Sequence, residues 1–157
     1  MYDFLDRPVG ALNVGGRLLV WSMRQWVKSS LAGRCACTKV GPAFHHWGLL
    51  AGLPHFQLMM VTLARGAREK MTFCDPMCMN IDESEALILG LFCTLREQGE
   101  EGFCKIATLI VHDTALVPLH LAVTALGRAL DGREIYPERP HIDAAPSSMW
   151  DGKGASG

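Results

Sequence analysis

Two pairs of cysteines are the residues whose type and spacing suggest chemistry. Cys74 and Cys78 are separated by three residues, and Cys35 and Cys37 by one. Three methionines surround the first pair: Met71, Met77 and Met79. Thiolate and thioether sulfur are soft ligands that suit Cu(I), and thiolates also bind zinc and iron–sulfur clusters. The four cysteines are therefore candidate ligands for a zinc, copper or iron–sulfur centre.

The spacing of the second pair favours a simpler alternative. The one-residue gap between Cys35 and Cys37 is shorter than the roughly two to four residues typical of zinc-binding pairs. Ordinary reduced cysteines are therefore the competing interpretation. A thiol switch is a third, because Cys74 lies near a predicted helix start, where the helix dipole favours a thiolate. Asp75 and Asp82 oppose this effect, since negative neighbours raise the pKa of a thiol.

The segment 72–78, which runs into a predicted helix, locally resembles the C-x-x-x-C copper loop of the Sco-type copper chaperones of cytochrome oxidase assembly. The resemblance covers about a dozen residues. It implies a copper site built from Cys74, Cys78 and a distal histidine, for which His112 and His120 are the candidates. That family has a thioredoxin-like fold with strands around the loop, whereas the flanking patterns here predict helices, so we do not assign the chain to it.

The elements that must position these loops are amphipathic helices. Apolar residues recur at a spacing of about 3.6 residues through most of the chain. The pattern predicts helices over these ranges: 16–31, 42–52, 54–70, 82–98, 101–112 and 116–130. Asp82 and Glu85 have the spacing of a capping box, which marks the start of the fourth helix. Residues 107–111 also suit a buried strand, but the length of the surrounding apolar pattern favours a helix.

These elements predict an all-α fold, a single-domain bundle of about six helices with a disordered C-terminal tail. The length of 157 residues suits one hydrophobic core. We expect an N-terminal arm over 1–13 and the helical domain over 14–136. Residues 137–157 are rich in Pro, Ser and Gly and contain few anchors, so they are the predicted tail.

The composition argues against several classes of function. The net charge is −1, from 15 basic and 16 acidic residues, and gives no signal for binding nucleic acid or an anionic membrane. The most apolar stretch, 49–64, is interrupted by polar and helix-breaking residues, so no transmembrane segment is predicted. No secretory leader is evident at the N-terminus, and we therefore expect a cytoplasmic protein with reduced cysteines.

Local motifs of catalysis are also missing. The chain contains no G-x-S-x-G, H-E-x-x-H, Walker or G-x-G-x-x-G pattern, which weighs against an enzyme. A site assembled from distant residues leaves no such motif, so the question stays open.

Our first hypothesis is a protein that acts by protein–protein interaction, as a regulator, adaptor or assembly factor. Trp21 and Trp47 are the expected anchors for the partner, and a homodimer is one form this interaction could take. One alternative is a cysteine-based metal-binding or thiol-redox protein that uses the Cys74/Cys78 loop. Another is a helical small-ligand carrier or enzyme, which requires a sizeable apolar pocket with a few converging polar groups.

Overall fold

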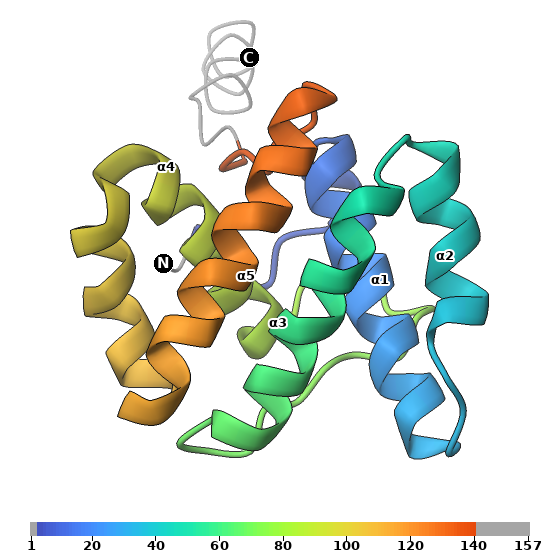
Figure 1. Ribbon diagram of the computed structural model, residues 1–157. Helices are drawn as coiled ribbons and strands as arrows, with labels where there is room; N and C mark the ends of the chain where they lie inside the picture. Colours follow the sequence, from blue (N-terminus) through green and yellow to red (C-terminus); the bar gives the residue numbers. More distant parts are fainter. Residues whose placement is uncertain (1–2, 141–157) are drawn as a thin grey trace, which may run out of the picture.

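The computed structural model describes residues 3–140, and within them every regular element is helical (Figure 1). The predicted all-α fold is confirmed. The elements are the 3-10 segments η1 (Val9–Ala11) and η2 (Leu50–Gly52) and the helices α1 (Val14–Leu31), α2 (Cys37–His46), α3 (Leu53–Gly66), α4 (Glu83–Ile110) and α5 (Asp113–Gly132). No helix in this part of the chain is both long and apolar enough to cross a membrane.

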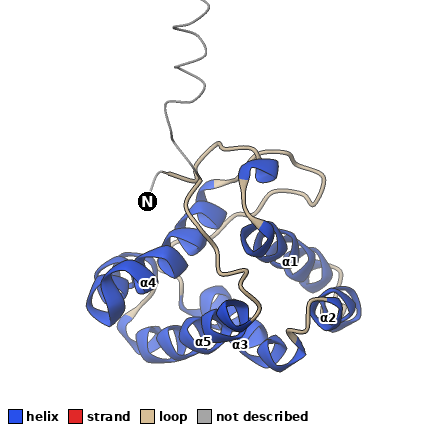
Figure 2. Ribbon diagram, turned by 90° about the horizontal axis from the view of Figure 1, so that it is seen from above, coloured by secondary structure: helices blue, strands red, loops and turns tan. Residues whose placement is uncertain are grey.

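Helices α3 and α5 lie side by side on one side of the molecule, and α1 and α4 lie behind them (Figures 1 and 2). Small residues let the pair approach closely, because a methyl group added at Gly66 would meet Ala115, and one added at Gly52 would meet Ala129. These contacts pair the start of each helix with the end of the other, so α3 and α5 are antiparallel.

The described residues contain five α-helices where about six were predicted, because the helices expected at 82–98 and 101–112 form one element. Gly99 kinks this element, α4, with a φ of 75° and a ψ of −163°. Only glycine adopts such a conformation without strain, so the predicted polar turn shrinks to a single residue. Residues 107–110 are helical, which excludes the strand alternative for them.

The prediction for α2 was wrong at both ends. The helix begins at Cys37, within the predicted loop, and ends at His46, before Trp47. Pro42, expected in the first turn, lies inside the helix. Proline removes one hydrogen bond there, to the carbonyl of Thr38, and the burial of Val40 and Phe44 holds the helix in place.

The predicted start of α4 agrees with the structure, and that of α1 lies two residues late. The side chain of Asn13 accepts a hydrogen bond from the backbone N–H of Gly16 at 3.0 Å, so α1 begins two residues before the predicted boundary. At α4 the capping box of Asp82 and Glu85 is formed in full. Both caps satisfy backbone donors that the first helical turn leaves unpaired.

The N-terminal arm is docked on the body. Phe4 is fully buried, and the backbone N–H groups of Asp6 and Val9 donate to the carbonyls of Ile81 and Met79 at 3.1 and 2.7 Å. The arm therefore covers the end of the 71–82 loop.

The chain after α5 is also anchored as far as residue 140. Arg139 donates to Glu97 at 3.0 Å and to Asp3 at 3.0 Å, and Tyr136 is buried. The first residues of the predicted disordered tail, 137–140, are therefore anchored on the body of the protein, and the prediction was wrong for them. The remainder of that tail, 141–157, lies outside the described residues.

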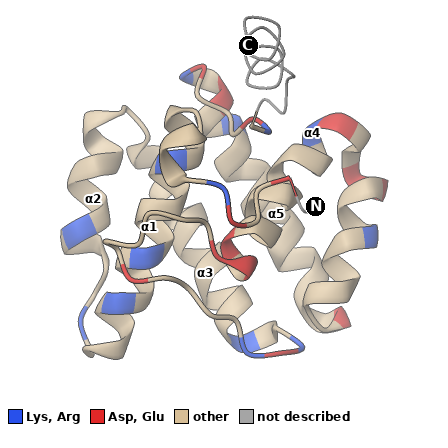
Figure 3. Cartoon of the chain, turned by 180° about the vertical axis from the view of Figure 1, so that it is seen from behind, with Lys and Arg blue, Asp and Glu red and all other residues tan. Residues whose placement is uncertain are grey.

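Charge is distributed unevenly over the bundle. The sequence contains no Asp or Glu between Arg7 and Arg68, so α1, α2 and α3 carry no carboxylate. In the view from behind, α1 and α2 show only basic bands, whereas acidic bands lie on α4 (Figure 3). A net charge close to zero therefore conceals a basic half and an acidic half.

Candidate functional site

Cys74 and Cys78 lie next to each other in the connection between α3 and α4. Their side chains are within hydrogen-bonding distance, and this contact, burial and the charge of Glu85 raise the pKa of Cys74 to about 12. Cys74 is therefore a thiol at neutral pH. Its raised pKa makes Cys74 a poor nucleophile in the reduced state.

A buried ion pair fixes this loop to the body. Arg24 of α1 donates from Nε and one Nη to the two carboxylate oxygens of Glu85, each at 2.8 Å. Its guanidinium also donates to the carbonyls of Cys78 and Asn80 at 2.6 and 2.8 Å. The hydrogen bond to Glu85 is the main cause of the raised pKa of Arg24. Both side chains are almost completely buried, so each charged group needs the opposite charge of its partner to offset the cost of burial.

Glu85 also serves the loop from its other side. Its carboxylate accepts hydrogen bonds from the backbone N–H groups of Cys74 at 3.2 Å and Asp82 at 3.0 Å. One carboxylate thus closes the capping box, binds Arg24 and orients the first cysteine of the pair. These contacts of Glu85 explain why the extended loop between residues 71 and 82 has a defined path, although it does not pair with strands on both of its sides.

Cys35 and Cys37 form a second pair at the start of α2. Cys35 is exposed, and hydrogen bonds from the Cys37 backbone and side chain lower the pKa of its thiol. The sulfur of Cys37 accepts a hydrogen bond from Gln57 Nε2 at 2.8 Å, and Gln57 Oε1 accepts one from Trp26 Nε1 at 2.6 Å. Through Gln57, hydrogen bonds therefore connect Cys37 to both α3 and α1.

The two cysteine pairs do not meet. Across residues 3–140, no three side chains of His, Cys, Asp or Glu converge in a way that could hold a metal ion. The four-cysteine centre envisaged from the sequence is thus not assembled, because the pairs lie on different connections. Within the same residues neither candidate histidine joins Cys74 and Cys78 in such a group: His120 packs against Phe103, and the backbone N–H of His112 donates to the carbonyl of Gly66.

The two tryptophans expected as partner anchors differ in exposure. Trp21 is half-buried and packs against the hydrophobic core. Trp47 is 38% exposed, directly after α2, with the edge of its ring against His46. Only Trp47 therefore offers a large free ring surface.

Several aliphatic side chains of α3, η2 and α5 are also exposed. Leu58 projects from α3, and Val117 and Leu121 lie one turn apart on the same side of α5. Leu50 of η2, which contacts both helices, is 50% exposed. We call these residues the α3/α5 face: Trp47, Leu50, Leu58, Val117 and Leu121. Except for Trp47, which directly follows α2, these residues lie on elements that pack against one another.

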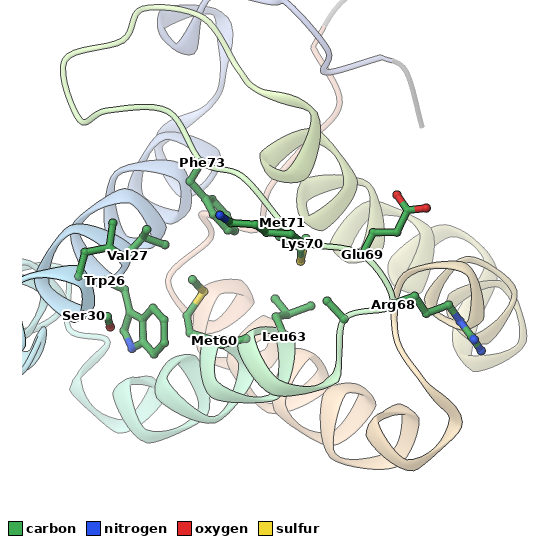
Figure 4. A pocket seen from close by; sticks show the side chains of 13 residues that line it. Trp26, Val27, Ser30, Met60, Leu63, Arg68, Glu69, Lys70, Met71 and Phe73 are labelled. Atoms are coloured by element: carbon green, nitrogen blue, oxygen red, sulfur yellow. The ribbon is translucent and has the colours of Figure 1, made fainter.

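A cavity of about 520 Å³ lies between α1, α3 and the segment 67–73 (Figure 4). Its walls are mainly apolar: α1 contributes Trp26, α3 contributes Met60 and Leu63, and the segment contributes Met71 and Phe73. The cavity has the size and lining typical of pockets for small molecules.

Sequence analysis missed this cavity and the α3/α5 face. The apolar residues at helical spacing in α3 and α5, such as Met59 and Leu126, are buried, and the signal for the face is the set of large apolar residues off that spacing, such as Leu58 and Leu121. Comparison of the chain with protein-family models, curated proteins and solved structures finds no match. The site must therefore be interpreted from its own geometry.

Proposed function

We propose that the protein acts by binding another protein through the α3/α5 face. The single observation that supports this proposal is the exposure of several large apolar side chains on adjoining elements. One exposed aliphatic residue is ordinary, whereas several on elements that pack together mark a candidate interaction surface. Water is released when such a surface is covered, and that release favours association.

Trp47 is the expected anchor of this interface. Aromatic residues near the centre or edge of a packed patch often contribute more than other interface residues to binding energy. The residue lies after a short helix and next to Leu50, so a partner can reach its ring without rearrangement of the core. This role would make the protein a regulator, adaptor or assembly factor, with no chemistry required of the chain itself.

Affinity capture from the native cells followed by reconstitution tests the proposal. Wild-type protein should retain a partner at a fixed stoichiometry, and Leu121→Glu should abolish its retention, because a carboxylate in an apolar interface is desolvated without a counter-charge. Trp47→Ala should weaken binding of the purified partner by at least about tenfold, as expected for an interface anchor.

Met77→Glu is the matched control. Met77 is as exposed and apolar as any residue of the face, but it lies on the 71–82 loop. If Met77→Glu and Leu121→Glu retain the same proteins as the wild type, the α3/α5 face is not the interface. Sedimentation of the purified chain shows in the same experiment whether the partner is a second copy.

A second candidate function rests on the adjacent thiols of Cys74 and Cys78. A small-molecule disulfide such as glutathione disulfide can oxidise them. The sulfur of Cys78 attacks first and releases one glutathione; Cys74 then loses its proton and attacks the Cys78 sulfur, releasing the second glutathione. Two protein thiols are oxidised and one glutathione disulfide is reduced to two thiols.

The closing step should depend steeply on pH. The hydrogen bond with Cys78, the largest cause of the raised pKa of Cys74, is lost in the mixed disulfide, but burial and the charge of Glu85 still raise that pKa. The thiolate fraction of Cys74 at neutral pH is therefore small and grows about tenfold per pH unit in that range. Mass spectrometry after acid quenching should show that disulfide closure accelerates as pH rises from neutral to alkaline. Cys74→Ser should stop at a mixed disulfide on Cys78, whereas Cys104→Ser should close normally. A closure rate that does not change with pH would count against this function.

A further inference from the structure

The cavity between α1, α3 and the segment 67–73 has an apolar interior. Met60 and Leu63 are almost completely buried and form its floor, and Trp26 stands at its side (Figure 4). Met71 and Phe73 cover it from the loop. At about 520 Å³ the cavity is larger than a few water molecules require, and its walls give water few hydrogen-bonding partners.

One cation is free at the mouth of this cavity. Lys70 extends along the segment toward Phe73, whereas Arg68 and Glu69 point away (Figure 4). Arg68 is already engaged, because it donates to the carbonyl of Thr108 at 2.7 Å and lies 3.5 Å from Asp113. Among the residues described, Lys70 has no ion-pair partner.

The other walls add no negative charge. No Asp or Glu occurs between Arg7 and Arg68, so neither α1 nor α3 places a carboxylate at the cavity. The only acidic lining residue is Glu69, and its side chain points outward. Among the described residues that line the cavity, Lys70 is therefore the cation that has no ion-pair partner.

We propose that this cavity binds an amphipathic monoanion, a straight-chain carboxylate whose tail lies among Trp26, Met60 and Phe73 and whose head group pairs with Lys70. The apolar walls favour the alkyl tail, and the flexible methionines can adapt to its shape. A single lysine matches one negative charge, so a dianion would lack a second cation and a cationic head would be repelled.

Decanoate is the probe that tests this assignment, with decan-1-ol and decyltrimethylammonium as matched ligands of other charge. Calorimetric titration of the full chain, below the micellar concentration of the two ionic ligands and the solubility limit of decanol, should give saturable binding of one decanoate per chain. Decanol should bind about tenfold more weakly because it loses the charge-assisted contact, and the cationic ligand should not bind.

Two variants separate the head-group site from the tail site. Lys70→Met keeps the apolar stem and removes the charge, so it should weaken decanoate about tenfold and leave decanol unchanged. Ala64→Phe places a ring in the cavity from an exposed position of α3, so it should abolish binding of both ligands without loss of helicity. Lys105→Met, which removes an exposed cation on α4, is the control and should bind like the wild type.

Three results would overturn the proposal: no saturable decanoate binding, equal affinity for decanoate and decanol, or unchanged decanoate affinity in Lys70→Met. The test is independent of the protein-binding function, because Leu121→Glu alters the α3/α5 face and should leave decanoate binding intact. Loss of decanoate binding in Ala64→Phe with retained partner capture would assign the two activities to different sides of α3.

Discussion

Glu85→Ala should lower the free energy of unfolding by about 3–5 kcal/mol, the largest loss expected from any single exchange considered for this chain. The substitution leaves the guanidinium of Arg24 buried without its counter-charge, and the backbone N–H groups of Cys74 and Asp82 lose their acceptor. Each of these groups is costly to bury unpaired. Urea unfolding followed by circular dichroism measures the change.

Glu83→Ala is the matched control, since Glu83 is an exposed carboxylate in the same first turn of α4. It should cost no more than about 1 kcal/mol, through loss of a favourable charge at the helix N-terminus. The double substitution Arg24→Met with Glu85→Leu should recover much of the lost stability, because it removes both charges together. Equal losses in the free energy of unfolding for Glu85→Ala and Glu83→Ala would show that the buried ion pair contributes no more to stability than an exposed carboxylate does.

The same network connects stability with the chemistry of the loop. The charge of Glu85 is one cause of the high pKa of Cys74, while Arg24 holds the carbonyl of Cys78. The two thiols are therefore held at the point where the loop is most firmly bound to the body. An exchange at Glu85 is expected to change the reactivity of Cys74 as well as the folding equilibrium.

The helices could be predicted because their signals are local. In α3 the spacing of Phe56, Met59, Met60 and Leu63 identifies the buried stripe, and all four are buried. The capping box at Asp82 is likewise contained within four residues. A pattern that repeats over one or two turns specifies which face meets the core, whatever that core is made of.

The site could not be predicted because its residues come together from distant parts of the chain. Arg24 falls on the polar side of the α1 pattern, where a basic residue is normally solvated, yet its partner lies 61 positions away. The cavity requires Trp26, Met60 and Phe73 from three separate segments. No spacing rule relates such residues, since their distance is set by the packing of the helices.

The charge asymmetry, in contrast, can be found from the sequence alone. A count over the whole chain gives −1 and suggests no field, whereas a count by segment finds no acidic residue between Arg7 and Arg68. Because of this asymmetry, the cavity walls that come from α1 and α3 place no carboxylate opposite Lys70. Net charge is informative about a site only when it is counted separately for each element that surrounds the site.

Gly15→Ala should produce the second large effect, a loss of about 2–3 kcal/mol in the free energy of unfolding, near the upper end for overpacking a tight site. A methyl group at Gly15 would collide with the backbone carbonyl of Ile135, which cannot move aside as a flexible side chain can. The segment after α5 would have to lift from α1. Asn13 would then lose its hydrogen bond to the carbonyl of Tyr136, now 2.7 Å long.

Gly132→Ala distinguishes this collision from the general effect of replacing glycine. Gly132 is the last residue of α5, has no atom near the position of an added methyl group and does not have a positive φ. Its substitution should be neutral or stabilise by up to about 1 kcal/mol, since alanine restricts the unfolded chain. Hydrogen exchange should show faster opening of residues 135–140 in Gly15→Ala alone. If the two variants have the same free energy of unfolding, the segment after α5 does not depend on its contact with α1. The N-terminal arm, whose Asp3 binds Arg139 of that segment, must then be held by other contacts.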